Sequence, residues 1–193
     1  MDINEWVALS VKHNASDLHL CTGHPPIWRQ EGSLRREEAG PPLSAAQLAQ
    51  WCDAWLDAGQ RQALAAHGQL DTAFTLPGGP RFRAHLFHQS RGLSAALRPL
   101  PVACPTPAAL GVPPVLLEWV TAEDGLILVT GATGSGKSTT LAALVGHLNH
   151  HHARHIITLE DPIEFLHVSD RCLIQQREVG QHCASFAQGL RGA

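Results

Sequence analysis

The stretch GATGSGKSTT at residues 131–140 constrains what this chain can fold into more than any other part of it. It matches the pattern G-x-x-x-x-G-K-[S/T] in full, and it follows a short, continuously apolar run, GLILVT, at residues 125–130. Such a run is typical of a buried parallel strand. After the loop, apolar residues recur at helical spacing and form one stripe of Leu141, Leu144, Val145 and Leu148. The order of strand, loop and helix predicts an α/β unit whose loop binds phosphate.

The residue types in this loop are those that hold a triphosphate. Glycines let backbone N–H groups turn inward around a β-phosphate, and the N-terminus of the following helix adds its positive pole. Lys137 supplies a point charge to the β- and γ-oxygens, and the Ser138 hydroxyl can bind Mg²⁺. We therefore predict ATP and Mg²⁺ as cofactors; the alternative is a glycine-rich turn without a ligand. The predicted binding residues are Gly131, Thr133, Gly134, Ser135, Gly136, Lys137, Ser138 and Thr139.

A second apolar run, HIITLEDPIEF at residues 155–165, ends in the acids Glu160, Asp161 and Glu164. Carboxylates at the carboxyl end of a parallel strand beside a phosphate loop serve Mg²⁺ or the attacking water, as a Walker B segment does. The residues alone thus predict catalytic roles for Glu160 and Asp161, together with Lys137, and an indirect metal role for Glu160. The alternative is an acidic turn that begins at the Asp-Pro pair.

The first half of the chain has the pattern of a small α+β domain. We predict a helix that is capped by Asp2 and Glu5 and runs to about His13, a strand at 16–20, and a hairpin that turns at Glu31-Gly32. A second helix is capped by Ser44 and Gln47. From Leu70 the apolar period becomes two, which predicts a three-stranded antiparallel meander. We expect Phe82, Ala84 and Leu86 on one face of its middle strand and Arg81, Arg83 and His85 on the other.

Prolines crowd residues 99–114 and indicate a linker. The predicted domains are therefore 1–100, then a linker and domain start at 101–122, then the phosphate-loop domain at 123–193.

The chain has 14 Lys+Arg against 17 Asp+Glu, so composition gives no basic surface for nucleic acid. No apolar run approaches the ~20 residues of a spanning helix, and we expect a cytoplasmic protein. Five cysteines without metal-ligand spacing predict free thiols. The histidines at 147–155 are interpreted as a solvated helix end rather than a metal-ligand set.

Several stretches together resemble one family, the secretion and type IV pilus ATPases, and in particular the PilT-type ATPases of pilus retraction and twitching motility. They are ASDLHL, GHPPIWRQEGSLRR, RFRAHLFHQSRGLSAALRPLP, the phosphate loop, HIITLEDPIEFLH and CLIQQREVG. The resemblance implies a PAS-like N-terminal domain, a RecA-like ATPase domain and a hexameric ring. It also implies an inner-membrane platform protein as partner, with the ATPase peripheral to that membrane. Arginines of the first domain, here Arg83, Arg98 and Arg91, would face the triphosphate.

The resemblance also revises the acidic run, because LEDPIE looks like the family's Asp box, while the Walker B strand comes later. Neither a Walker B strand nor the family's His box is found in the 193 residues. We therefore expect a chain that is truncated before Walker B, an incomplete RecA-like domain that binds ATP and hydrolyses it weakly or not at all. The alternatives are a non-catalytic nucleotide-binding or assembly module and a small P-loop kinase.

Overall fold

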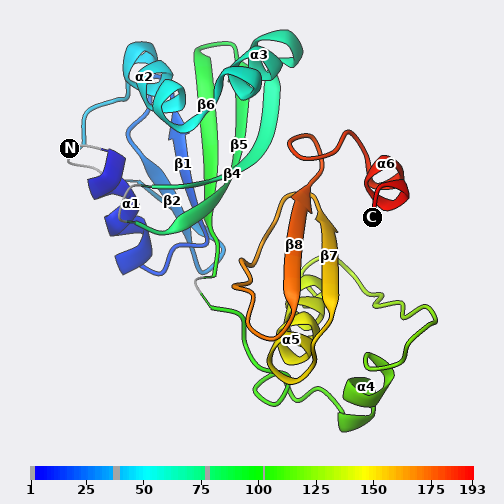
Figure 1. Ribbon diagram of the computed structural model, residues 1–193. Helices are drawn as coiled ribbons and strands as arrows, with labels where there is room; N and C mark the ends of the chain where they lie inside the picture. Colours follow the sequence, from blue (N-terminus) through cyan, green and yellow to red (C-terminus); the bar gives the residue numbers. More distant parts are fainter. Residues whose placement is uncertain (1–2, 37–39, 77–78, 102) are drawn as a thin grey trace. The chain divides into compact units, whose positions relative to one another are not determined.

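The computed structural model describes residues 3–36, 40–76, 79–101 and 103–193. Within it the chain separates into two compact units, Met1–Leu100 and Pro101–Ala193. The first unit is built on one antiparallel sheet, and the second on a parallel strand pair and the helix α5 (Figure 1). The predicted N-terminal cap at Asp2 lies outside the described residues.

Six strands form the sheet of the first unit, in the spatial order β3-β2-β1-β6-β5-β4, with every neighbouring pair antiparallel. The predicted meander is confirmed as β4 to β6, and the predicted hairpin as β2 and β3. Glu31 and Gly32 turn that hairpin at φ values of 51° and 80°, which suit a two-residue turn. The strands are β1 (Asp17–Cys21), β2 (Ile27–Gln30), β3 (Ser33–Arg36), β4 (Gln69–Thr75), β5 (Arg81–Gln89) and β6 (Gly92–Pro99).

One face of this sheet carries the hydrophobic core. Phe82, Ala84 and Leu86 on β5 are fully buried on it, as their alternation predicts, whereas Arg83 is exposed on the other face. Residues of three helices, α1 (Ile3–Lys12), α2 (Ala45–Trp55) and α3 (Ala58–His67), belong to the same core cluster. Each fully buried large apolar side chain contributes about 1.5–3 kcal/mol, so this face holds the unit together.

Capping boxes start two of these helices. The Ser44 hydroxyl accepts the N–H of Gln47 at 3.2 Å, and the Gln47 side chain accepts the N–H of Ser44 at 2.9 Å, as predicted. The helix α3 was not predicted, although Asp57 and Gln60 form the same reciprocal pair at 2.8 and 3.0 Å. Leu64 is its one buried residue among those described, so its sequence lacks the apolar stripe that marks a helix.

The second unit contains α4 (Pro114–Trp119), α5 (Lys137–His151), β7 (His155–Glu160), β8 (Leu173–Glu178) and α6 (Phe186–Arg191). The strands β7 and β8 are parallel neighbours in register from His155 opposite Leu173 to Glu160 opposite Glu178. Ser185 caps α6 by accepting the N–H of Gln188 at 3.2 Å.

The predicted buried strand at 125–130 is wrong for this structure. Those residues form no strand, and the side chains of Leu126 and Leu128 are 81% and 73% exposed. An apolar run is suited to a buried strand, but it forms one only if another strand pairs with it. Here β7 and β8 pair with each other and not with this segment. The five cysteines are free, and none of the described helices is long and apolar enough to cross a bilayer.

Candidate functional site

In the loop at 131–136, the positions with a positive backbone φ, a conformation that side chains other than glycine's rarely adopt, are glycines. Gly131 has a φ of 154°, and a Cβ placed on it would lie 2.6 Å from Ser135 Oγ, inside contact distance. Gly136 has a φ of 89° and is the N-cap of α5, where no side chain caps the first turn. The first backbone N–H groups of α5 are therefore open to an anion at the positive end of the helix dipole.

Lys137, the first residue of α5, folds back over this loop. Its ammonium donates to the carbonyl oxygens of Gly131 and Ala132 at 2.9 and 2.8 Å. These two carbonyl oxygens keep the Lys137 ammonium beside the loop. A bound phosphate oxygen would replace them as its hydrogen-bond acceptor. The hydroxyl of Ser138 makes no hydrogen bond within the described part of the chain.

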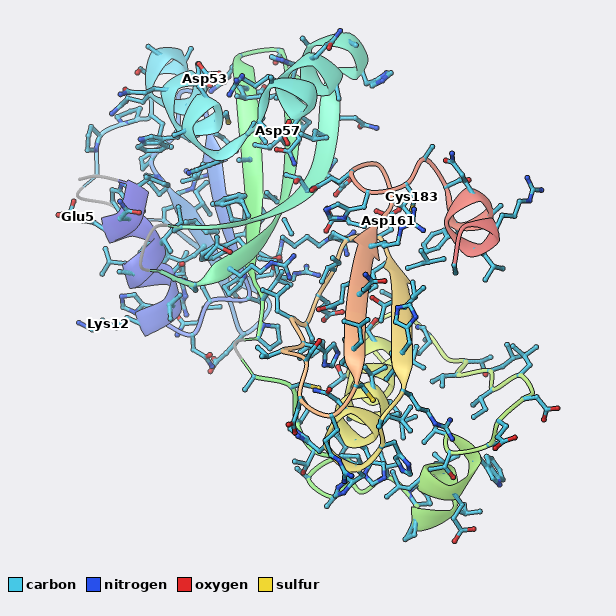
Figure 2. The ribbon with its side chains drawn as sticks, in the orientation of Figure 1. Glu5, Lys12, Asp53, Asp57, Asp161 and Cys183 are labelled. Atoms are coloured by element: carbon cyan, nitrogen blue, oxygen red, sulfur yellow. The ribbon has the colours of Figure 1, made fainter. Side chains whose placement is uncertain are left out.

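The connection between α5 and β7 brings the loop and the predicted acids to one end of the unit. Residues 152–154 alone separate the helix from the strand, so the two run in opposite directions. The 15-residue helix is about 22 Å long and the six-residue strand about 20 Å. The start of α5 and Glu160 therefore lie toward the same end of the unit, and Figure 2 shows Asp161 just past the end of β7.

Glu160 ends β7 and is held by two neighbours. The Thr158 hydroxyl and the Gln176 side-chain amide donate to the same Glu160 oxygen, at 2.6 and 3.0 Å. Asp161 follows in an exposed turn and is joined to Pro162 by a cis peptide bond. One Glu160 oxygen thus already accepts two hydrogen bonds within the protein, while the Asp161 carboxylate faces solvent.

Glu178, which was not predicted as a site residue, lies beside Glu160 in the parallel register. It is 4% exposed, and one of its oxygens accepts the N–H of Ile163 at 3.0 Å, which ties the turn after Asp161 to β8. Its position at the carboxyl end of a strand was the available signal. We applied that signal to β7 but not to β8.

The predicted arginines lie on the polar face of the first unit's sheet. Arg83 on β5 is directly opposite Arg98 on β6. Arg98 donates through Nε and Nη2 to one oxygen of Asp17, at 3.0 and 2.8 Å. Arg91 precedes β6, about 23 Å of strand away from Arg98, and contacts His24 at 3.1 Å. The structure therefore brings Arg83 and Arg98 together and places Arg91 elsewhere.

Asp17 is the centre of this polar face. Burial opposes its ionisation, but hydrogen bonds from Arg98 and Ser16 and the Arg98 charge outweigh this and hold the pKa of Asp17 below its usual value. Arg29 approaches its second oxygen at 3.7 Å. Like charges opposite each other on a sheet destabilise it, so Asp17 offsets the proximity of Arg83 and Arg98.

The histidine-rich stretch forms the last turns of α5, as predicted. The His147 and His151 rings lie 4.5 Å apart, and His150 pairs with Asp170 at 2.9 Å. Among the residues that the structure describes, no three ligating side chains converge as a metal site would need. The stretch therefore ends the helix, and its reading as a solvated helix end stays a prediction.

Comparison with known proteins identifies the family. A family model described as "Type II/IV secretion system protein" matches residues 113–193. Over all 193 residues the chain is 44% identical to "Type IV pilus retractation ATPase PilT" of Pseudomonas aeruginosa (strain PAO1). The chain belongs to this secretion and pilus ATPase family.

Two further matches extend over the whole chain. It is 55% identical over 193 residues to "Uncharacterized protein YggR" of Escherichia coli (strain K12) and covers 58% of it. The solved structure "Crystal Structure of the Pilus Retraction Motor PilT and Bound ADP" superimposes on all of the chain with a TM-score of 0.93 at 40% identity. The chain covers 56% of that structure and 56% of the Pseudomonas relative, little more than half the length of either.

The loop of this family member has the donor set that a nucleotide with Mg²⁺ needs. It combines open helix N–H groups, the Lys137 ammonium and the Ser138 hydroxyl. An oxygen ligand of this kind suits Mg²⁺, which retains waters and binds through few protein groups. Because one oxygen of the Glu160 carboxylate is already hydrogen-bonded, this group is better suited to contact Mg²⁺ through a water molecule than directly.

Proposed function

We propose that this protein binds ATP with Mg²⁺ and is a motor ATPase that couples ATP hydrolysis to pilus disassembly or a related transport step. The observation that carries the proposal is the start of α5, where an uncapped helix N-terminus, glycines in open conformations and Lys137 meet. The names of the relatives support the same direction, since they include a type IV pilus retraction ATPase.

Each loop group has a distinct task in this proposal. The backbone N–H groups of Gly134 and of residues 136–139 would cradle the β-phosphate, and Lys137 would leave the carbonyls of Gly131 and Ala132 to bind the β- and γ-oxygens. Mg²⁺, when bound, would neutralise phosphate charge. The Ser138 hydroxyl would hold it, and Glu160 and Asp161 at the end of β7 would assist through water.

We also propose a role for two arginines of the first unit. Arg83 forms no ion pair with any described residue, and Arg98 is oriented by its contact with Asp17; in the proposal both supply N–H groups that stabilise charge developing during phosphoryl transfer. In this proposal the first unit is the PAS-like domain and the second is RecA-like. We further propose a hexameric ring that meets a platform protein at the cytoplasmic side of the inner membrane.

ATP binding is tested by calorimetry with Mg·ATP. The chain contains two lysines, so Lys137→Ala and Lys12→Ala are matched changes in different units. Losing a charge-assisted contact costs about 1.5–3 kcal/mol, so Lys137→Ala should weaken binding roughly 10- to 150-fold. Lys12→Ala should leave the affinity unchanged. If the two variants bind Mg·ATP equally well, the loop is not the site.

Hydrolysis separates the motor from a non-catalytic nucleotide-binding module. Phosphate release is measured from the whole protein and from Lys137→Ala, with Mg²⁺ present and after chelation. The motor proposal expects turnover that needs both Lys137 and the metal. ATP binding of normal affinity with no release of phosphate by the whole protein would favour the module.

A further inference from the structure

The second unit contains a cavity of about 480 Å³ that the proposed function does not use. It lies between the proline-rich segment 104–108, the C-terminal half of α5 and the loop 166–168. No residue of the phosphate loop lines it. Its volume is in the range of small-molecule sites, about 300–1,000 Å³.

The walls of this cavity combine apolar surface with imidazole rings. Pro105, Leu117 and Val168 supply apolar surface, and the described lining contains no lysine, arginine, aspartate or glutamate. Burial, followed by the neighbouring imidazoles of His151 and His152, lowers the pKa of His147, which leaves this ring neutral at neutral pH. The C-terminal half of a helix also disfavours anions. An uncharged ligand fits these walls best.

His147 and His151 are two of the four imidazoles in the described lining of the cavity. His147 and His151 line it with their rings 4.5 Å apart, and neither ring forms a hydrogen bond to a residue that the structure describes. A neutral imidazole offers one N–H donor and one nitrogen acceptor. A planar ring that carries both a donor and an acceptor is therefore complementary to this wall.

Gly146 lines the cavity at a position of α5 that has no side chain. A Cβ placed on this residue would meet no described atom within 4 Å, so no packing contact requires glycine there. Glycine in the middle of a helix costs about 1 kcal/mol relative to alanine. The missing side chain widens the slot beside His147 and makes room for a flat ring.

Hydrogen bonds connect one cavity wall to Glu160 and the two walls to each other. The Gln176 side chain accepts the N–H of His167 at 2.8 Å, and its amide donates to Phe165 O at 2.8 Å and to Glu160 at 3.0 Å. On the other wall, the buried Asn149 on α5 donates to Val168 O at 2.8 Å. Displacement of loop 166–168 is thus transmitted to Glu160, and displacement of α5 to the phosphate loop.

We propose that this cavity binds an uncharged, planar heteroaromatic molecule and that its occupancy changes the affinity of the phosphate loop for ATP through Gln176. Binding in the cavity stands by itself, whereas the effect on ATP rests on the proposed function. By thermodynamic reciprocity, ATP changes the affinity of the cavity by the same factor.

Benzimidazole is the probe, because it is flat, uncharged at pH 8 and carries one donor and one acceptor. Ligand-observed NMR titration of the 193-residue chain should give a dissociation constant of about 0.1–1 mM. Gly146→Leu fills the slot and should weaken binding at least 10-fold, while improving helix propensity. His147→Phe keeps the ring but removes its nitrogens and should weaken binding roughly 3- to 10-fold. Ala187→Leu, on an exposed face of α6, is the matched control and should bind normally.

No binding by the unaltered chain, or equal binding by Gly146→Leu and Ala187→Leu, overturns the cavity site. Coupling is measured as the Mg·ATP affinity with and without 5 mM benzimidazole. We expect a change of at least threefold that Gln176→Leu abolishes, and an unchanged ATP affinity overturns the coupling. The NMR signal of the Gln176 side-chain amide reads the same coupling without nucleotide, so failure of ATP to bind refutes the proposed function and leaves this test intact.

Discussion

Replacement of Asp17 tests whether the arginine row on the first sheet depends on a single carboxylate. Asp17→Asn removes the charge that Arg98 contacts twice and Arg29 approaches, and leaves Arg83 opposite an uncompensated Arg98. A hydrogen bond to a charged group contributes about 1.5–3 kcal/mol. The Asp17 side chain is 13% exposed but that of Arg98 is 63% exposed, so solvent screening reduces this figure. We expect a coupling energy of about 1–2 kcal/mol.

The assay is a double-mutant cycle of Asp17→Asn, Arg98→Gln and the double variant, measured by urea unfolding. Four of the five tryptophans lie in residues 1–100, so tryptophan fluorescence reports mainly on this unit. With a slope of about 1 kcal/mol per molar urea, Asp17→Asn should lower the midpoint by about 1–2 M. His85 and Asp71 give a control cycle on the same face, because they lie 3.3 Å apart and are 41% and 50% exposed. That pair should couple by at most about 0.5 kcal/mol.

The pH dependence provides an independent check of the same reasoning. The folded-state pKa of Asp17 lies below its ordinary value of 3.8, so its stabilising contribution is complete above pH 3.8. That contribution is lost as the pH falls through the folded-state pKa. The difference in stability between the unaltered chain and Asp17→Asn should therefore shrink below about pH 3.8. A coupling energy no larger than that of the His85 control pair, or a difference that persists at low pH, would refute the argument.

Three further predictions concern close packing and burial. Gly131→Ala places a Cβ 2.6 Å from Ser135 Oγ and should weaken Mg·ATP binding at least 10-fold in calorimetry, with circular dichroism unchanged. Gly189→Ala places a Cβ 2.7 Å from Leu159 Cδ2, so α6 should separate from β7 and exchange its amide hydrogens faster at a cost of about 1–3 kcal/mol. Burial raises the pKa of the Cys52 thiol to about 12, so at pH 8 a thiol reagent should modify Cys52 only after unfolding; rapid labelling of the folded chain would contradict this.

Local patterns explain the parts of the fold that were predicted correctly. The alternation of Phe82 and Arg83 identified β5, and the Ser44 and Gln47 pair identified the start of α2. Pairing over long sequence distances was not predictable in this way. Leu18 pairs with Leu97 to join β1 and β6 into one sheet, and no local pattern in either strand specifies the other.

The candidate site also combines features of local sequence with partners from distant segments. Spacing alone made the loop around Lys137 a candidate, and strand position did the same for Glu160; both roles stay predictions. The partners that hold these groups were missed, because they come from distant segments. Gln176 reaches Glu160 from β8, and Asp17 reaches Arg98 across 81 residues of sequence. Such pairs become visible only when strand register is known, since register decides which side chains share a face.

The exposed segment 125–130 has a consequence for measurements of ligand affinity. Its backbone makes no hydrogen bond to the residues described, and it leads without interruption into Gly131. A strand that adds to this segment would also restrict the conformations open to the start of the loop. Strand addition and anion binding would order overlapping parts of the backbone. Either event therefore lowers the conformational entropy that the other must remove. Under the proposed function, the apparent affinity for ATP would accordingly depend on the loop and on the state of this preceding segment.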